Sequence, residues 1–171
     1  MLVLTTERLR LRWANEADAA FMLDLLNQPS WIANIGDRGV RTLAQAADWI
    51  EVRLVMAYRT QGFGFWLVER TLDGERVGLC GLTKRDTLPE VDVGYAFLPA
   101  FWGQGYAREA AAACLQHARE ALHLRCVLAI TGPDNAASAR VLEAIGMRFV
   151  EQRVLEGETR QTCVYAWEQE R

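Results

Sequence analysis

The sequence predicts an α/β domain whose mixed (α+β) sheet is predominantly antiparallel and is flanked by helices. Segments with the alternating polarity of strands recur between segments with the 3.6-residue periodicity of helices. Turn signals rich in glycine or proline separate three consecutive strands, which is typical of antiparallel pairing. One strand is followed by a strong helix and another apolar strand, which is the pattern of a parallel crossover.

The first half of the chain predicts one strand and two helices. Over residues 8–13, leucine and tryptophan alternate with arginine, as in a half-buried strand. Asn15 or Asp18 can cap a helix after this strand, and a loop is expected over residues 27–41. Thr42 can cap a longer helix, because apolar residues recur after it with helical spacing.

The second half predicts most of the sheet. The expected elements are strands at 63–69, 76–83 and 91–98, a helix at 104–122, a strand at 125–131, a helix from about 135 to 146, and a hairpin of strands at 147–155 and 161–167. Strand, helix and strand over residues 91–131 form the crossover, so those two strands should be parallel.

Length and charge limit the classes of function. With 171 residues, 51% of them hydrophobic, we expect a single domain over residues 1–171 with a sizeable core. A net charge of −3 argues against a nucleic-acid partner, and Lys84 is the only lysine available to bind phosphate. Apolar runs typical of a signal peptide or membrane span are missing, so we expect a cytoplasmic protein without a membrane partner. The four cysteines form no C-x-x-C pair, so no metal site is expected.

A glycine-rich turn before the strong helix is the main candidate for chemistry. Gly103, Gly105 and Ala107 leave the backbone unobstructed where a helix begins with unpaired N–H groups and a positive dipole end. This arrangement can hold a phosphate or pyrophosphate without lysine. The alternative is a tight turn that needs glycine only for its φ angles. A P-loop is excluded because Tyr106 and Ala107 replace the required Lys and Ser or Thr, and a dinucleotide fingerprint would need glycine at Arg108.

Three motifs carry a resemblance to a known family. The run from Pro89 to Ala111, PEVDVGYAFLPAFWGQGYAREAA, resembles the core motif of the Gcn5-related N-acetyltransferase (GNAT) superfamily. It is most similar to the branch that includes the ribosomal-protein alanine N-acetyltransferases, whose motif T-E-R-L-x-L-R matches residues 6–12. Their motif N-x-x-S-x-x-x-L-x-x-x-G-[MF] matches residues 135–147. The resemblance implies a GNAT-like fold, with a central, splayed pair of parallel strands in a predominantly antiparallel sheet.

The resemblance also implies a donor, acetyl-CoA, and the residues that bind it. These are Val93, Gly94, Tyr95, Gly103, Gln104, Gly105, Tyr106, Ala107, Arg108, Asn135 and Ser138. Trp102 departs from the Arg or Gln that usually begins the family's phosphate loop, which implies that backbone amides hold the pyrophosphate. The pantetheine arm would fill the gap between the splayed strands. Gly94 suits such a close approach, and an ordinary bulge is the alternative.

Catalytic roles follow from the same resemblance and from chemistry. Many relatives use a tyrosine on the helix after Asn135 as the acid, but no tyrosine lies between Asn135 and Gly146. Ser138 is the substitute candidate, either as an acid for the leaving thiolate or only as a donor contact. Glu90 is the candidate base for the attacking amine, with Asp92 expected on the same strand face. The alternative is that both acids are merely solvated.

The acceptor is less defined. The resemblance implies direct attack by a primary amine, on a peptide N-terminus or a small molecule, in a ternary complex. The early helices and residues 31–41 should form the acceptor cleft, and Trp31 is either a wall of that cleft or a hydrophobic plug. Glu156 and Glu158 could also approach its mouth. A non-catalytic acyl-CoA-binding module and a transferase for a longer acyl-CoA are the alternatives, and a homodimer is the default assembly.

Overall fold

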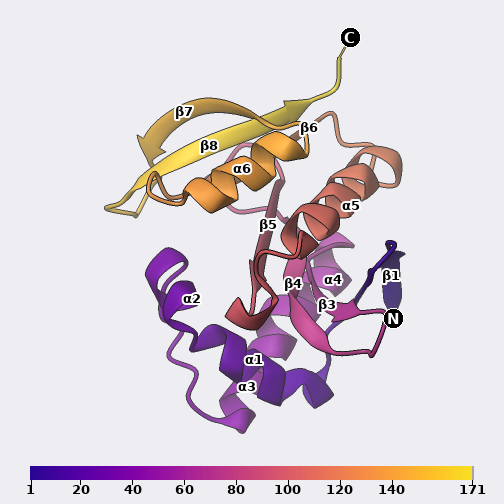
Figure 1. The fold of residues 1–171 in the computed structure, drawn as a ribbon. Coiled ribbons are helices and arrows are strands. Elements are labelled where there is room, and N and C mark those ends of the chain that lie inside the picture. The colour runs from indigo at the N-terminus through magenta and orange to yellow at the C-terminus, as the bar shows by residue number, and fades with distance from the viewer. Residues whose placement is uncertain (171) are drawn as a thin grey trace.

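One eight-stranded sheet runs through the computed structural model, which describes residues 1–170 (Figure 1). The strand order is β1-β2-β3-β4-β5-β6-β8-β7, and every neighbouring pair except β5–β6 is antiparallel. The strands are β1 (Leu2–Thr5), β2 (Leu9–Arg12), β3 (Phe65–Arg70), β4 (Arg76–Thr83), β5 (Asp92–Phe97), β6 (Cys126–Thr131), β7 (Arg148–Val154) and β8 (Gln161–Glu168).

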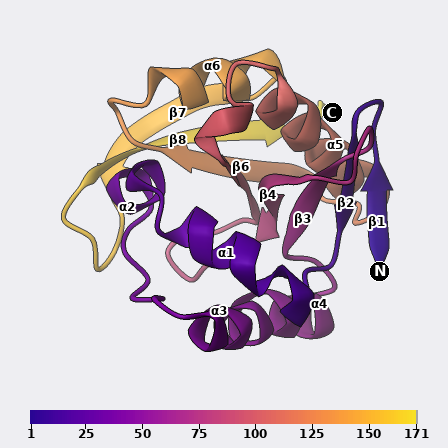
Figure 2. The ribbon, with the colours of Figure 1, turned by 60° about the horizontal axis from the view of Figure 1, so that its bottom comes forward.

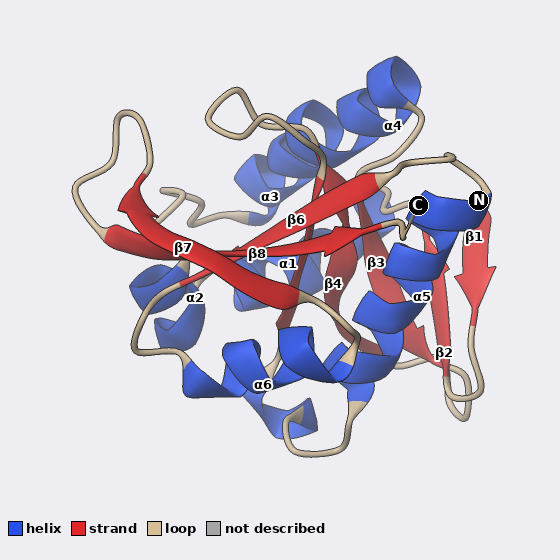
Figure 3. Ribbon diagram, turned by 90° about the horizontal axis from the view of Figure 1, so that it is seen from above, coloured by secondary structure: helices blue, strands red, loops and turns tan. Residues whose placement is uncertain are grey.

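Helices cover both faces of this sheet. Figures 2 and 3 show α1, α3 and α4 on one face, and α5 and α6 on the other. The helices are α1 (Ala19–Leu26), α2 (Pro29–Asn34), α3 (Leu43–Trp49), α4 (Met56–Gln61), α5 (Tyr106–Glu120) and α6 (Ala136–Ala144). A π-helical segment over Ile50–Val55 joins α3 to α4. Within residues 1–170, no helix combines the length and the apolar character that a membrane crossing requires.

The predicted mixed α/β class is confirmed, and its elements have local causes. Leu9 and Leu11 of β2 are fully buried, as the alternation with arginine predicts. Asn15 is the cap after β2 and forms a capping box with Asp18, while Thr42 caps α3 by accepting from the Gln45 amide. These caps explain why the first helices begin where the sequence indicates.

Two elements were not expected. Strand β1 pairs with β2 at the edge of the sheet, and its four residues are too few to show a clear alternation. The loop predicted over residues 27–41 is wrong for its first part, where α2 forms. Pro29 occupies its first turn, and Trp31 is buried and packs edge-to-face on Trp49 at 6.4 Å between ring centroids. Trp31 is therefore a hydrophobic plug and not an exposed wall.

The parallel pair is splayed, as the GNAT-like fold requires. Strand β5 pairs with β4 along its whole length, from Thr83↔Asp92 to Gly78↔Phe97. In contrast, β5 and β6 pair only at Asp92↔Leu128, where the Leu128 amide donates to the Val91 carbonyl at 2.9 Å. Beyond this point the two strands separate, so β5 presents an open backbone edge toward β6.

Candidate functional site

The glycine-rich turn lies between β5 and α5 and exposes a run of free amides. Gly103 and Gly105 have left-handed φ angles of 72° and 81°, and no side chain caps α5. The first helical hydrogen bond runs from the Glu109 amide to the Gly105 carbonyl at 3.0 Å. None of the amides of residues 103–108 donates a hydrogen bond to another of residues 1–170.

The structure allows the two explanations of this turn, a tight bend that needs glycine and a phosphate-binding loop, to be compared. The positive φ angles by themselves account for glycine at both positions. They do not account for six consecutive amides without an acceptor at the positive end of a helix dipole. Such amides are the donors that bind phosphate oxygens. The turn therefore has the chemistry for a pyrophosphate, and it needs no cationic side chain.

Trp102 and Arg8 flank this loop. The Trp102 indole donates from Nε1 to the carbonyl of Phe97, the last residue of β5, at 2.9 Å. This bond therefore uses none of the loop amides. Arg8 donates from Nη1 to the Gln104 carbonyl at 2.8 Å. The sequence reasoning missed Arg8, although its motif was recognised, because a motif match does not show what a residue contacts.

The open edge of β5 shows which backbone groups face the gap. The Val91 carbonyl faces β6, whereas the Leu98 amide donates to Val77 of β4 at 3.0 Å. Because backbone groups alternate between the two edges of a strand, those of Val93 and Tyr95 face the gap and those of Gly94 face β4. The parallel bridge Asp92↔Leu128 uses the Val93 amide as a donor to the Leu128 carbonyl, so a ligand in the gap would meet the amide of Tyr95.

Gly94 has a packing reason that sequence reasoning did not identify. A Cβ atom at this position would lie 3.0 Å from Cε1 of Phe65, so the glycine leaves room for that ring. The β4–β5 register continues through Gly94 without a shift, so the expected alternative of a bulge is not what the structure shows.

Tyr95 and Ser138 meet across the gap, from β5 and α6. The Tyr95 hydroxyl lies 2.8 Å from Oγ of Ser138 and 3.3 Å from the Ser138 carbonyl oxygen. Burial raises the pKa of Tyr95 to about 12, although the hydrogen bond with Ser138 opposes this shift. The strand therefore supplies a tyrosine hydroxyl beside the helix that lacks one of its own.

Asn135 is the residue that begins α6. Asn135 is the N-cap of α6, and its Oδ1 accepts from the Ser138 amide at 3.1 Å. Nδ2 of Asn135 makes no hydrogen bond to another of residues 1–170, so it can donate to a ligand in the gap. The cap thus positions both Asn135 and Ser138 at the same end of α6.

The two predicted acids occupy different environments. Asp92 is buried, and its two carboxylate oxygens accept from Arg85 at 2.8 and 2.9 Å. Burial raises the pKa of Asp92, and Arg85 opposes that shift. Glu90 precedes β5 and is exposed, without an ion pair or hydrogen bond to another of residues 1–170. The strand alternation that predicted a shared face therefore does not extend to Glu90.

Glu90 lies near the start of β6. Burial first, and then the charges of Glu168 and Glu90, raise the pKa of Cys126. Since Asp92 pairs with Leu128 in parallel, Glu90 and Cys126 both precede the point where the strands meet. Glu90 is thus a solvent-accessible carboxylate beside the closed end of the splayed pair.

The expected acceptor side is framed by α2 and the β7–β8 turn, which lie near one another in Figure 2. Arg160 of this turn donates from Nη1 to the Ala33 carbonyl at 2.7 Å. Glu156 and Glu158 of the same turn are exposed. This contact joins two segments that are 127 residues apart in the sequence.

Two of the four cysteines lie side by side in the core. Cys80 and Cys114 are buried with their sulfur atoms 3.5 Å apart, and burial raises the pKa of Cys114 well above its ordinary value. Such a thiol stays protonated and is a poor nucleophile. Within residues 1–170, no group of three or more His, Cys, Asp or Glu side chains is placed to hold a metal ion.

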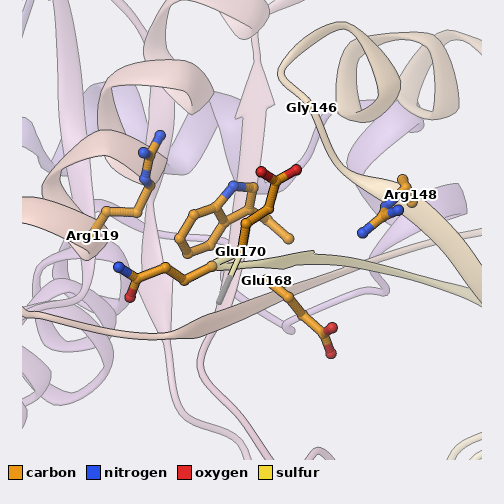
Figure 4. Close-up of a pocket in the computed structure, with 7 residues that line it drawn as sticks. Arg119, Gly146, Arg148, Glu168 and Glu170 are labelled. Atoms are coloured by element: carbon orange, nitrogen blue, oxygen red, sulfur yellow. The ribbon is translucent and has the colours of Figure 1, made fainter.

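A hollow of about 530 Å³ lies elsewhere, at the end of β8 (Figure 4). Its lining includes Arg119, Gly146 and Trp167, and the Arg119 guanidinium lies 4.7 Å from the centre of the Trp167 ring. Arg119 is near the C-terminus of α5, about 20 Å along that helix from its N-terminus. This hollow is therefore separate from the glycine-rich turn.

Comparison with known proteins connects this geometry to a family. The family model described as an acetyltransferase (GNAT) domain matches residues 8–148. Among curated proteins, the uncharacterized protein YkkB of Bacillus subtilis (strain 168) is 32% identical over 151 residues, which cover 85% of each chain.

Solved structures agree with this match. An acetyltransferase from Agrobacterium tumefaciens str. C58 superposes with a TM-score of 0.80 at 28% identity, covering 97% of this chain and 94% of the other. The ribosomal L7/L12 alpha-N-protein acetyltransferase RimL, in complex with coenzyme A, has a TM-score of 0.82 at 17% identity and covers 98% of both chains. The second similarity concerns the fold alone.

Proposed function

Since the chain belongs to the acetyltransferase (GNAT) family and is therefore an acyltransferase, we propose that it moves the acetyl group of acetyl-CoA to a primary amine. The acceptor would be a peptide N-terminus or a small-molecule amine. The observation that carries this proposal is the run of free amides at residues 103–108, beside the open edge of β5. The free amides would bind an anionic group, and the open strand edge would bind an extended arm of the same ligand.

The residues present fit such a donor. The free amides and the helix dipole would hold the pyrophosphate. The side chains of Arg108, in the first turn of α5, and Arg140, in α6, are exposed and would meet outer phosphates. Nδ2 of Asn135 and the edge of β5 at Tyr95 would bind the amide groups of the pantetheine arm. Acetyl-CoA, when bound, supplies an acetyl group already activated as a thioester.

Proton transfer is assigned to Glu90 and Ser138. A protonated amine cannot attack a carbonyl carbon, so Glu90 would accept its proton, directly or through water. A backbone amide of β5 that faces the gap would polarise the carbonyl. The leaving sulfur needs a proton, and Oγ of Ser138 would donate one. The same hydroxyl could instead only contact the donor, and the two roles differ in their effect on turnover.

Tyr95 would support the acid role of Ser138. A hydroxyl with a pKa of about 12 remains protonated at neutral pH. Tyr95 can therefore donate to Oγ of Ser138, which leaves the Ser138 hydrogen free to point into the gap. A proton lost by Ser138 would be replaced from Tyr95 along the same hydrogen bond, and the Tyr95 phenolate would then take a proton from water.

The experiment combines binding with turnover. Acetyl-CoA should raise the melting temperature, and free CoA should be released with at least one amine from a panel of peptide N-termini, polyamines, amino acids and aminoglycosides. Acetyl-CoA without an amine is the control for hydrolysis. An unchanged melting temperature would contradict donor binding. A raised melting temperature without CoA release from any amine would instead indicate a non-catalytic binding module or a different acyl donor.

A further inference from the structure

The N-terminal motif at residues 6–8 packs against the start of α5, about a hundred residues later in the sequence. Arg8 donates from Nη1 to the Gln104 carbonyl at 2.8 Å and from Nε to Oε2 of Glu109 at 2.7 Å. The Thr6 hydroxyl and the Arg8 amide donate to Oε1 of Glu109 at 2.6 and 2.8 Å. Both oxygens of the Glu109 carboxylate are therefore occupied by this motif.

The contact with the Gln104 carbonyl determines where the next amide points. In a planar trans peptide, the carbonyl oxygen and the following N–H lie on opposite sides. Arg8 holds the Gln104 oxygen on the side of β2, so the Gly105 N–H is directed to the other side. Gly103 and Gly105 flank Gln104, and glycine imposes little orientation of its own. The direction of this amide thus depends on Arg8.

Arg8 is itself held rigidly. Its guanidinium lies 4.6 Å from the centre of the Tyr106 ring, and Glu109 neutralises its charge. Burial tends to raise the pKa of Glu109, but the bonds from Thr6 and Arg8 outweigh it and lower that pKa. Glu109 therefore stays ionised at neutral pH. Nε and Nη1 of Arg8 are thus engaged by Glu109 and the Gln104 carbonyl, which fixes the guanidinium beside the loop.

We propose that Arg8 is a positioning residue that orients the Gly105 amide toward the pyrophosphate of the donor. This inference rests on the proposed function, because it requires that the loop binds coenzyme A. Such a role concerns only ligands that carry the pyrophosphate. A purely structural brace would instead affect every ligand of the protein alike.

The test compares ligands with and without the pyrophosphate. Arg8→Gln should raise the Kd for coenzyme A about tenfold, as measured by calorimetry. This is the expected effect of losing one charge-assisted hydrogen bond that orients the amide. The kcat/KM for acetyl-CoA should fall by a similar factor, while that for S-acetylpantetheine, which lacks the pyrophosphate, should not change. Arg59→Gln is the matched control, since Arg59 pairs with Glu51 on the surface and does not contact the loop.

The outcomes separate the two proposals. If the parent protein does not bind coenzyme A, the proposed function fails. If it binds and Arg8→Gln binds equally well, or if both donors lose equally, the positioning role is overturned and the function stands. If Arg8→Gln does not fold, NMR on the parent protein tests whether the Gly105 amide faces the pyrophosphate. The Gly105 amide resonance should shift with coenzyme A and not with pantetheine, and an unshifted resonance would overturn the proposal.

Discussion

The proposed donor end and the proposed acceptor end of the site are built differently. At the donor end, Arg8 donates to the Gln104 carbonyl of the loop and to the Glu109 carboxylate, and Trp102 donates to the Phe97 carbonyl of β5. At the acceptor end, Glu90 makes no hydrogen bond or ion pair with another of residues 1–170, and Gly36 and Gly39 interrupt the chain after α2. The donor end is built on the start of a helix, whereas the acceptor end is built on turns, in which Asp37 pairs with Arg41 and Arg160 donates to the Ala33 carbonyl.

The difference teaches how one fold can serve many acceptors. A donor that is always the same rewards a rigid site, because preorganised groups lose little entropy on binding. An acceptor that differs between relatives is met by loops and turns, which tolerate change. We therefore expect substitutions at the donor end to weaken or abolish donor binding, and those at the acceptor end to alter turnover while the donor still binds.

The largest effect should follow from Gly105→Glu. The backbone at φ 81° is strained for any side chain, and a Cβ atom would lie 3.3 Å from Nη2 of Arg8. A carboxylate would also repel the phosphates. We expect the stabilisation by acetyl-CoA, about 2.7 kcal/mol at a hundredfold excess over Kd, to disappear. Thermal denaturation with and without acetyl-CoA measures it.

The matched control for this prediction is Gly74→Glu. Gly74 has φ 72° and open space around its Cβ position, but it lies in the β3–β4 turn away from the loop. It should lower the melting temperature by itself and keep the shift caused by acetyl-CoA. Retention of that shift in Gly105→Glu would show that the donor end does not bind through this loop.

The next effect concerns the pair that bridges the gap. Ser138→Ala should lower kcat about a hundredfold if Ser138 is the acid, with the affinity for acetyl-CoA retained. Tyr95→Phe removes only the supporting hydroxyl and should lower kcat by about tenfold, by weakening one hydrogen bond. Steady-state kinetics on both variants and on the double variant measure the coupling. Strictly additive losses would contradict a shared role.

The next effect is expected at the acceptor end, where a substitution should lower turnover and leave donor binding unchanged. Glu90→Gln should lower kcat by at least about tenfold, because the amide cannot accept a proton, while the Kd for acetyl-CoA stays the same. Asp86→Asn is the control, since Asp86 is also exposed and lies in the same β4–β5 connection. An unchanged rate in Glu90→Gln would remove Glu90 from the base role and direct attention to Glu156 and Glu158.

A substitution of Asp18, which is buried between Arg12 and Arg76, should have the smallest effect on the donor and acceptor ends of the site. Burial tends to raise the pKa of Asp18, but its hydrogen bonds to Arg12, Asn15 and Arg76 outweigh that effect and lower it. A lowered pKa in the folded protein means that the ionised carboxylate stabilises the fold above the usual pKa of about 3.9. This contribution is lost as the pH falls through the folded pKa.

The measurement is denaturant unfolding from pH 7 to acid. Asp18→Asn should unfold more easily than the parent at pH 7, and the difference should shrink at acid pH, while the kinetic constants at pH 7 do not change. A difference that is constant with pH would show that the Asp18 charge contributes nothing to stability.

Local features were determined by the sequence itself. The glycine-rich turn before α5 and the Thr42 cap were both predicted at the residues where the structure has them. The crossover of parallel strands was predicted as well. Each depends on interactions within a few residues, namely φ angles, side-chain caps and the periodicity of apolar positions. Such signals are readable from a short window of sequence.

Only the tertiary structure decided which distant residues complete the site. Arg8 and Gln104 are 96 residues apart, and Tyr95 and Ser138 are 43 apart, yet each pair is within hydrogen-bond distance. Glu90 and Asp92 are two residues apart and of the same chemical type, but the start of β5 buries one and exposes the other. No local pattern encodes these outcomes, because strand pairing and helix packing set the separation of such residues in space.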